Sequence, residues 1–276
     1  MPARRRDLSL HYAYNTEWRD YPSVFVLSTG RCGTETLTAL AGLSPQLMSA
    51  HEPRPRLIKT SFDAYLAGAS VSIDPHWRDV VLASRDDFVR DAASRGRTYV
   101  ETNNRLTYLA PALASAFPAS RFIHLYREPY AFVRSAMRRN YYAGHPWDFS
   151  RIRPKPHEPL AESWNSMPRM DRCAWLWSQT NQDALTWLAT LPTERRLSLS
   201  AEDLFAGRDA VVEELFAFCG VAVPPGHQVK TVLGAKMNAQ SRGDFPEASA
   251  WPEDDRALVW SYVGDVAGAL GYAKTS

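Results

Sequence analysis

Lysine is scarce in this sequence. Only five of the 32 basic residues are lysine, whereas 27 are arginine, and 30 acidic residues reduce the formal net charge to +2. With so small a net charge the chain has no global field to attract nucleic acid, so an anionic ligand must be bound by a local cluster of positive charge. Arginine suits that task because its planar guanidinium makes paired hydrogen bonds to phosphate, sulfate or carboxylate. A biased genomic base composition would produce the same excess, and the sequence leaves both explanations open.

Cysteine and long apolar runs are also rare. The three cysteines, Cys32, Cys173 and Cys219, are far apart and form no C-x-x-C pair, which argues against a disulfide framework and a zinc knuckle. No run approaches the roughly 18 consecutive apolar residues of a membrane span. The basic N-terminal residues are not followed by the apolar segment of a signal peptide. We therefore expect a cytoplasmic protein without a membrane span.

Short apolar runs alternate with helical patterns along the 276 residues. The predicted strands cover 24–28, 46–50, 97–101, 121–126 and 196–199, and the predicted helices 34–43, 106–117, 130–142, 171–191, 208–219 and 254–270. This alternation predicts an α/β fold, a parallel doubly wound sheet flanked by helices. Ligands of such sheets bind beyond the carboxyl ends of the strands. No repeat or domain boundary is evident, so we predict a single domain over residues 1–276.

Residues 143–170 interrupt the alternation with five prolines and several aromatic residues. A stretch this long without regular structure inside a compact domain is more often a functional lid than a passive connection. We therefore expect a lid over 143–170. Aromatic residues just before and at its start are expected to wall a ligand pocket, namely Tyr141, Tyr142, Trp147 and Phe149.

A glycine-containing loop, residues 28–36, joins the first predicted strand to the first predicted helix. A loop that runs into a helix N-terminus directs several backbone N–H groups at one point, and the helix dipole adds positive potential there. Gly30 and Gly33 let the backbone approach a phosphate, Arg31 adds charge, and two threonines add hydroxyl groups. The loop predicts an anion site, and a plain tight turn with a capping threonine is the alternative.

A second pair of polar residues follows the most apolar predicted strand. Arg127 ends that strand, and Ser135 lies eight positions later, about two turns into the next helix. A group bound above the strand can contact the guanidinium and the hydroxyl together. Alone the pair is a weak signal, because both residue types are common.

Four segments resemble, in the same order, the motifs of sulfotransferases that use 3′-phosphoadenosine 5′-phosphosulfate. Residues 25–34 resemble the 5′-phosphosulfate loop in its Gly-Arg-Ser-Gly-Thr form, with Cys32 in the serine position. Residues 117–135 resemble the 3′-phosphate motif, including the step from arginine to serine. Residues 202–221 resemble the Tyr-Glu-Asp-Leu segment and its helix, and residues 270–272 resemble the usual C-terminal ending.

The resemblance implies a P-loop-like sulfotransferase fold and metal-free transfer of a sulfuryl group to a hydroxyl or amine of a small molecule, glycan or lipid. The residues implied to bind the 5′-phosphosulfate are Arg31, Cys32, Gly33, Thr34, Glu35 and Thr36. Arg127 and Ser135 are implied to bind the 3′-phosphate, and Asn238 and Ser241 are candidates for contact with adenine.

Two alternatives remain open from the sequence. A P-loop kinase of a small metabolite would use a similar loop, although residues 28–36 lack the Gly-Lys-Ser/Thr ending of a Walker A motif. A non-catalytic nucleotide-binding protein is the other alternative, because Thr102 stands where many relatives have a lysine near the donor. Thr36 also stands where cytosolic members often have an aromatic residue that stacks on adenine.

His51 and Glu52 end the second predicted strand and are candidates for the base that accepts the acceptor's proton. Arg31 is the candidate for stabilising the departing phosphate. Histidine side chains ordinarily titrate near neutral pH, whereas a glutamate needs desolvation to raise its pKa. The branch of the family with this loop type commonly uses a glutamate here, which favours Glu52 and leaves His51 as the rival. Structural roles are also open, since His51 could cap the strand and Glu52 could pair with Arg54 or Arg56.

Overall fold

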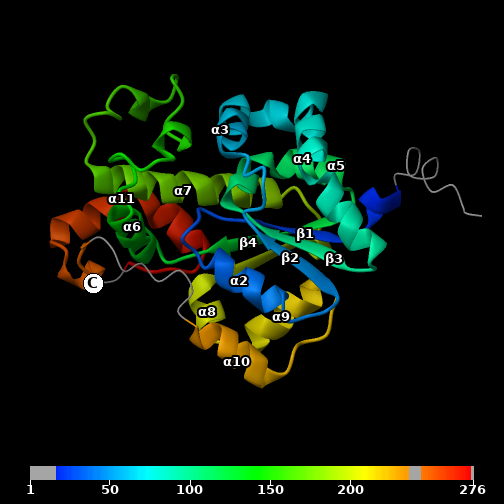
Figure 1. Ribbon diagram of the computed structural model, residues 1–276. Coiled ribbons are helices and arrows are strands. Elements are labelled where there is room, and N and C mark those ends of the chain that lie inside the picture. The colour runs from blue at the N-terminus through cyan, green and yellow to red at the C-terminus, as the bar shows by residue number, and fades with distance from the viewer. Residues whose placement is uncertain (1–16, 236–243, 275–276) are drawn as a thin grey trace, which may run out of the picture.

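A computed structural model describes residues 17–235 and 244–274 (Figure 1). Within these residues five strands form one parallel sheet in the order β2-β3-β1-β4-β5. The strands are β1 (Ser23–Leu27), β2 (Leu47–His51), β3 (Thr98–Thr102), β4 (Ser120–Tyr126) and β5 (Arg196–Ser200). All five coincide with predicted strands to within about one residue, and the predicted parallel α/β sheet is confirmed.

Helices cover both faces of the sheet (Figure 1). Helices α2 (Thr34–Ala41), α8 (Ala201–Phe205), α9 (Asp209–Cys219) and α10 (Gly226–Gly234) lie on one side. On the other side lie α3 (Ile58–Ala67), α4 (Pro75–Ser94), α5 (Ala110–Ala116), α6 (Pro129–Arg138), α7 (Arg169–Leu188) and α11 (Glu253–Ala269). None of the helices in the described part of the chain is both long enough and apolar enough to cross a membrane.

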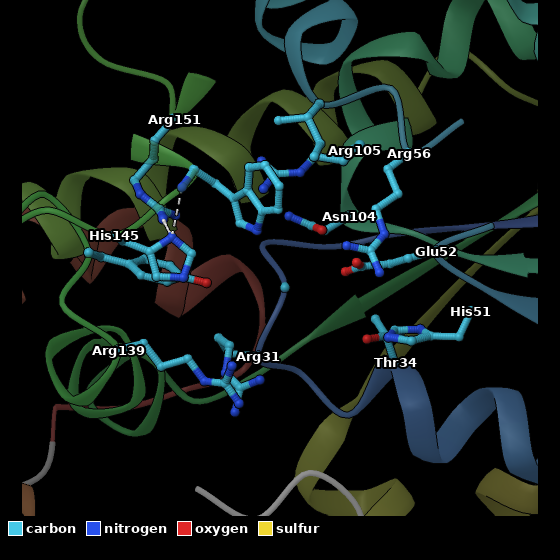
Figure 2. A pocket seen from close by; sticks show the side chains of 14 residues that line it. Arg31, Thr34, His51, Glu52, Arg56, Asn104, Arg105, Arg139, His145 and Arg151 are labelled. Carbon is cyan, nitrogen blue, oxygen red and sulfur yellow. Dashed lines mark hydrogen bonds between the residues drawn. The ribbon is translucent and has the colours of Figure 1, made fainter. Parts of the chain in front are cut away.

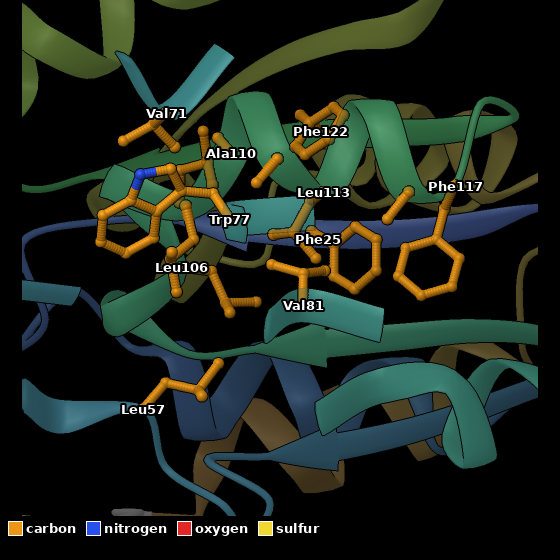
Figure 3. Packing of buried hydrophobic residues seen from close by; sticks show 14 of the residues in the cluster. Phe25, Leu57, Val71, Trp77, Val81, Leu106, Ala110, Leu113, Phe117 and Phe122 are labelled. Carbon is orange, nitrogen blue, oxygen red and sulfur yellow. The ribbon is translucent and has the colours of Figure 1, made fainter. Parts of the chain in front are cut away.

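Strand β1 is buried on both faces and therefore belongs to two cores. Val24 and Val26 pack toward α2 and α9, whereas Phe25 and Leu27 pack toward α4 and α5. Successive side chains of a strand point to opposite faces, so one short apolar run serves both layers. Figure 3 shows Phe25 between Val81 and Phe117 in the second of these cores. Full burial of each such side chain contributes roughly 1.5–3 kcal/mol.

A third cluster lies among α6, α7 and α11 and includes the fully buried Trp177. The proline-rich residues 143–170 are fixed to it by Ile152, Trp164 and Met167, each less than 9% exposed. Within that segment only two short 3₁₀ helices form, Asp148–Ser150 and Pro159–Ala161. The expected irregular segment is thus present, and it is anchored by its own apolar side chains.

Two helices between β2 and β3 were not predicted from the sequence. In α4 the buried residues Trp77, Val81 and Val89 recur at helical spacing, but charged residues between them obscure the pattern. The predicted helix 106–117 is also divided, into a 3₁₀ helix η3 (Asn104–Leu109) and α5. Pro111 explains the division, because proline has no N–H to donate and its ring clashes with the carbonyl four residues earlier.

A buried ion pair connects α4 to the sheet. The Arg85 guanidinium donates two hydrogen bonds to Glu101, at 2.6 and 2.8 Å, and both side chains are fully buried. Glu101 also accepts hydrogen bonds from Tyr99 and Asn103. Arg85 donates a further bond to the carbonyl of Pro55, in the segment that follows β2. The pair therefore fixes that segment to the sheet.

We expect Glu101→Gln to lower the free energy of unfolding by about 3–5 kcal/mol, because Arg85 would keep a buried charge without a counterion. Urea denaturation of the variant measures this loss. Asp63→Asn is the matched control, since the Lys59–Asp63 pair is exposed and such pairs contribute under about 1 kcal/mol. Equal stability of Glu101→Gln and wild type would contradict the assignment.

Candidate functional site

A cavity of about 190 Å³ lies beyond the carboxyl ends of β1, β2 and β3 (Figure 2). Its lining comes from segments that follow these strands, from the end of α6 and from the start of residues 143–170. The lining residues are Gly30, Arg31, Thr34, His51, Glu52, Arg56, Ile58, Asn104, Arg105, Arg139, Tyr141, His145, Trp147 and Arg151. This is the edge where parallel sheets of this class bind ligands.

The cavity is strongly cationic. Its lining contains five arginines and two histidines but a single carboxylate, Glu52. Burial and the nearby positive charges of Arg139 and Arg127 lower the pKa of Arg31. Burial and the charge of Arg151 likewise lower the pKa of Arg105. An anion bound here would relieve this repulsion, because an opposite charge favours the protonated guanidinium.

The loop before α2 is bent by three residues with positive φ, namely Gly30 (75°), Arg31 (60°) and Gly33 (85°). This conformation is unfavourable for a non-glycine residue such as Arg31. Arg127 helps to hold it, because its Nη1 donates a 2.9 Å hydrogen bond to the Arg31 carbonyl. The first-turn N–H groups of α2 have no partners inside the helix, so they are available to an anion at this end.

The two predicted phosphate motifs meet through Arg31. Its Nε donates a 3.1 Å hydrogen bond to Ser135 Oγ on α6. Arg127 and Ser135 do not line the 190 Å³ cavity and instead contact Arg31, which does line it. The structure thus brings these three predicted residues together.

Glu202 connects the other two motif segments, residues 202–221 and 270–272, to the segment that contains Arg127. One carboxylate oxygen accepts a hydrogen bond from the backbone N–H of Glu128 at 3.2 Å and lies 4.0 Å from Arg127 Nε. The other accepts bonds from the hydroxyls of Tyr272, at 2.8 Å, and Ser200, at 3.2 Å. Sequence reasoning found the segments but not this junction, because residues so far apart in the chain give no spacing signal.

The other predicted loop residues are placed differently. Thr34 lines the cavity, whereas the side chain of Thr36 is buried and Glu35 does not contribute to the lining. The Cys32 thiol is fully buried, lies 3.0 Å from Thr29 Oγ1, and has its pKa raised by burial to about 11. In the serine position it therefore offers only its backbone to a ligand at the cavity.

Gly33 is required by packing as well as by its backbone angle. A Cβ atom at this position would lie 2.4 Å from the ring of Phe205, on α8. The space beside Gly33 is thus filled by a protein side chain, which sequence reasoning did not anticipate. The candidates for adenine contact, Asn238 and Ser241, lie outside the described residues.

His51 and Glu52 both line the cavity, at the carboxyl end of β2. His51 Nδ1 lies 2.8 Å from Thr102 Oγ1, which in turn lies 2.5 Å from Thr38 Oγ1. Thr102, in the position expected for a lysine, therefore orients the imidazole. Glu52 has a positive φ of 42°, and its N–H donates to the Thr102 carbonyl at 3.0 Å.

Sequence reasoning did not single out three of the cationic lining residues, Arg105, His145 and Arg151, and considered Arg56 only as a possible ion-pair partner of Glu52. Arg105 follows Thr102 by three residues. The segment that lacks the expected lysine therefore still contributes a positive charge to the cavity lining. His145 and Arg151 lie within the predicted lid and contact each other at 3.3 Å. Of the four aromatic residues expected to wall a pocket, Tyr141 and Trp147 line the cavity, whereas Tyr142 packs in the third cluster and Phe149 is exposed to solvent. The positions of these side chains depend on how three strand ends converge, which the sequence does not state.

Comparison with known proteins places these features in a family. A family model described as "Sulfotransferase family" matches residues 22–225. A comparison with curated proteins finds no significant match.

Solved structures of similar fold include three sulfotransferases. The sulfotransferase domain from the curacin biosynthetic pathway is 16% identical with a TM-score of 0.57, and 92% of this chain and 99% of that chain are covered. The sulfotransferase domain from the Synechococcus PCC 7002 olefin synthase is 16% identical, with a TM-score of 0.54 and coverage of 92% and 95%. A sulfotransferase from Alicyclobacillus acidocaldarius is 17% identical, with a TM-score of 0.50 and coverage of 92% and 97%. At these identities the likeness concerns the fold.

The burial of all three cysteines predicts that the native protein is unreactive toward thiol reagents. Burial raises the pKa to about 11 for Cys32 and to about 12 for both Cys173 and Cys219. We expect modification by Ellman's reagent at pH 8 to be at least about 100-fold slower in the native protein than in urea. Rapid native modification of Cys32, located by mass spectrometry, would contradict the described loop.

Proposed function

Because the chain belongs to the sulfotransferase family, we propose that it transfers a sulfuryl group from 3′-phosphoadenosine 5′-phosphosulfate to a hydroxyl or amine of an acceptor. The observation that carries this proposal is the contact of Arg31 with both Ser135 and Arg127 at the edge of a cationic cavity. This contact connects Arg31, the candidate residue for binding the sulfonate, to Arg127 and Ser135, the candidates for binding a second anionic group.

The residues present fit the proposed donor. Guanidinium groups, backbone N–H groups at a helix start and hydroxyls are the donor types that bind phosphate and sulfate. Around the 5′-phosphosulfate we place the side chains of Arg31 and Thr34, together with the backbone of residues 32–36. Around the 3′-phosphate we place Arg127 and Ser135, whose contacts with Arg31 couple the two sites.

The donor supplies an activated sulfuryl group and a leaving phosphate. Arg31 would stabilise the charge that develops on that phosphate, in a partly buried site where electrostatic effects are stronger than in water. Its hydrogen bond to Ser135 and the bond of Arg127 to its carbonyl hold it in place beforehand. In this proposal arginines supply the positive charge, and no metal ion is required.

Glu52 is the proposed base, and His51 is its rival. Both line the cavity with Arg31, so either can reach an acceptor hydroxyl bound there. Thr102 orients His51, which is compatible with catalysis and with support of the β2 end. Glu52 is preferred because it is the single carboxylate of the lining and lies in the same cavity as Arg31.

Residues 143–170 are proposed to close over the acceptor within a single domain of residues 1–276. The start of this segment already lines the cavity with Trp147 and Arg151. The family match favours sulfuryl transfer over the kinase alternative. Arg105 contributes positive charge close to Thr102, where the expected lysine is absent, and this supports an enzyme over the non-catalytic alternative.

We expect Arg127→Ala to weaken binding of adenosine 3′,5′-bisphosphate much more than binding of AMP, since only the bisphosphate carries a 3′-phosphate. The loss of a charge-assisted contact should cost about 1.5–3 kcal/mol. Calorimetric titration of both nucleotides measures the difference. Arg95→Gln, on the exposed end of α4, is the control and should leave both affinities unchanged. Equal losses for both nucleotides in Arg127→Ala would remove Arg127 from the 3′-phosphate site.

We expect Glu52→Gln to lower kcat by about 10²–10⁴-fold with little change in donor affinity, because an amide keeps the size of the carboxylate but cannot accept a proton. His51→Ala should have a smaller effect, through loss of its contact with Thr102. Steady-state assays with saturating donor give the order of the two variants. The reverse order would assign the base to His51 instead.

A further inference from the structure

The cavity holds more positive charge than the proposed donor accounts for. Arg31 is oriented toward the residues proposed to bind the donor, as its bond to Ser135 shows. Arg56 and Arg105 come from different segments, after β2 and after β3. In Figure 2 they lie on the side of Glu52, whereas Arg31 and Arg139 lie on the opposite side. The extra charge is therefore on the side where an acceptor would meet the proposed base.

No carboxylate of the described residues lies within ion-pair distance of Arg105, although the charge of Glu52 acts on it and partly offsets the lowering of its pKa. Within the described residues its guanidinium makes no hydrogen bond or ion pair, although the residue is half-buried. Arg151, in the same cavity, differs because it donates to Asp148 at 2.8 Å. Burial lowers the pKa of Arg105, which means that its charge is poorly solvated where it lies. A half-buried guanidinium without a partner is expected to bind an anionic ligand.

Glu52 does not serve as this partner. It forms no ion pair with Arg105 or Arg56 within the described residues, although all three line the cavity and its charge acts on Arg105 from a longer distance. A carboxylate that accepts a proton during the reaction also loses its negative charge, so it could not neutralise Arg105 throughout. A bound anion would supply negative charge beside Arg105, with the exposed Arg56 as a second contact.

We propose that the acceptor carries a carboxylate, phosphate or sulfate group close to the hydroxyl or amine that is sulfated, and that Arg105, with Arg56 at the rim, binds this group. The inference rests on the proposed function. The part of the acceptor that enters is small, because the cavity volume is about 190 Å³. Tyr141 and Trp147 give it flat apolar walls, which suit a ring or a short chain beside the anion.

Matched pairs of acid and neutral compounds test this inference. The pairs are 4-hydroxyphenylacetate and 4-hydroxyphenylacetamide, glucuronic acid and glucose, and glycerol 3-phosphate and glycerol, so that aromatic acids, sugar acids and phosphate esters are distinguished. Each is titrated by calorimetry into protein saturated with adenosine 3′,5′-bisphosphate and is then assayed as an acceptor. We expect at least one acid to bind about 10-fold more tightly than its neutral partner.

Arg105→Gln should abolish most of that preference while changing bisphosphate affinity by less than about 3-fold. Arg95→Gln, which removes an exposed arginine far from the cavity, is the control and should preserve the preference. Circular dichroism and thermal unfolding verify that each variant is folded.

Three results would overturn the inference. If the bisphosphate binds but no acid is preferred, the acceptor site does not select an anion, and the proposed function stands. If Arg31→Gln abolishes the preference and Arg105→Gln does not, the acids occupy the sulfonate position. If the bisphosphate itself does not bind, the proposed function fails and this inference fails with it.

Discussion

The gathering of partly buried arginines around one small cavity is the constraint on which the rest of the site depends. Burial is the main cause of the lowered pKa values of Arg31 and Arg105, and the positive charges around them lower these values further. Only a rigid frame can hold such side chains together without a ligand. The parallel sheet provides that frame, because the carboxyl ends of β1, β2 and β3 lie side by side at one edge, and β1 and β3 are buried while β2 is hydrogen-bonded to β3.

Two sets of polar contacts fix the loops of the site relative to the sheet. Glu202 accepts hydrogen bonds from the backbone of Glu128 and from the hydroxyls of Ser200 and Tyr272, so it fixes these three segments relative to one another. Arg127, next to Glu128, donates a hydrogen bond to the carbonyl of Arg31 and so helps to fix the loop. On the other side, the buried Arg85 and Glu101 hold the segment after β2 through the Pro55 carbonyl. The candidate base and the candidate anion loop are thus positioned by different parts of the core, so each can be altered separately by mutation.

Local patterns in the sequence predicted the elements that have strong local signals. The apolar run before Gly30, the glycine loop and the apolar strand before Arg127 are each short, continuous and bounded by turn residues, and all three lie where they were expected. Helix α4 was missed because its buried positions are separated by charged residues. Arg105 was missed for a different reason, because an arginine in a loop has no local pattern and its role depends on which strand ends lie beside it. Resemblance to known motifs located the loop, whereas only the fold shows what surrounds it.

Calorimetric titration of the wild-type protein with adenosine 3′,5′-bisphosphate, compared with ADP and with ATP in the presence of Mg²⁺, tests the central claim most directly. A site built on Arg31, Arg127 and Ser135 for two separate anionic groups predicts that the bisphosphate binds at least about 10-fold more tightly than ADP and needs no Mg²⁺. Tighter binding of ATP with Mg²⁺, together with weak or absent binding of the bisphosphate, would contradict the account.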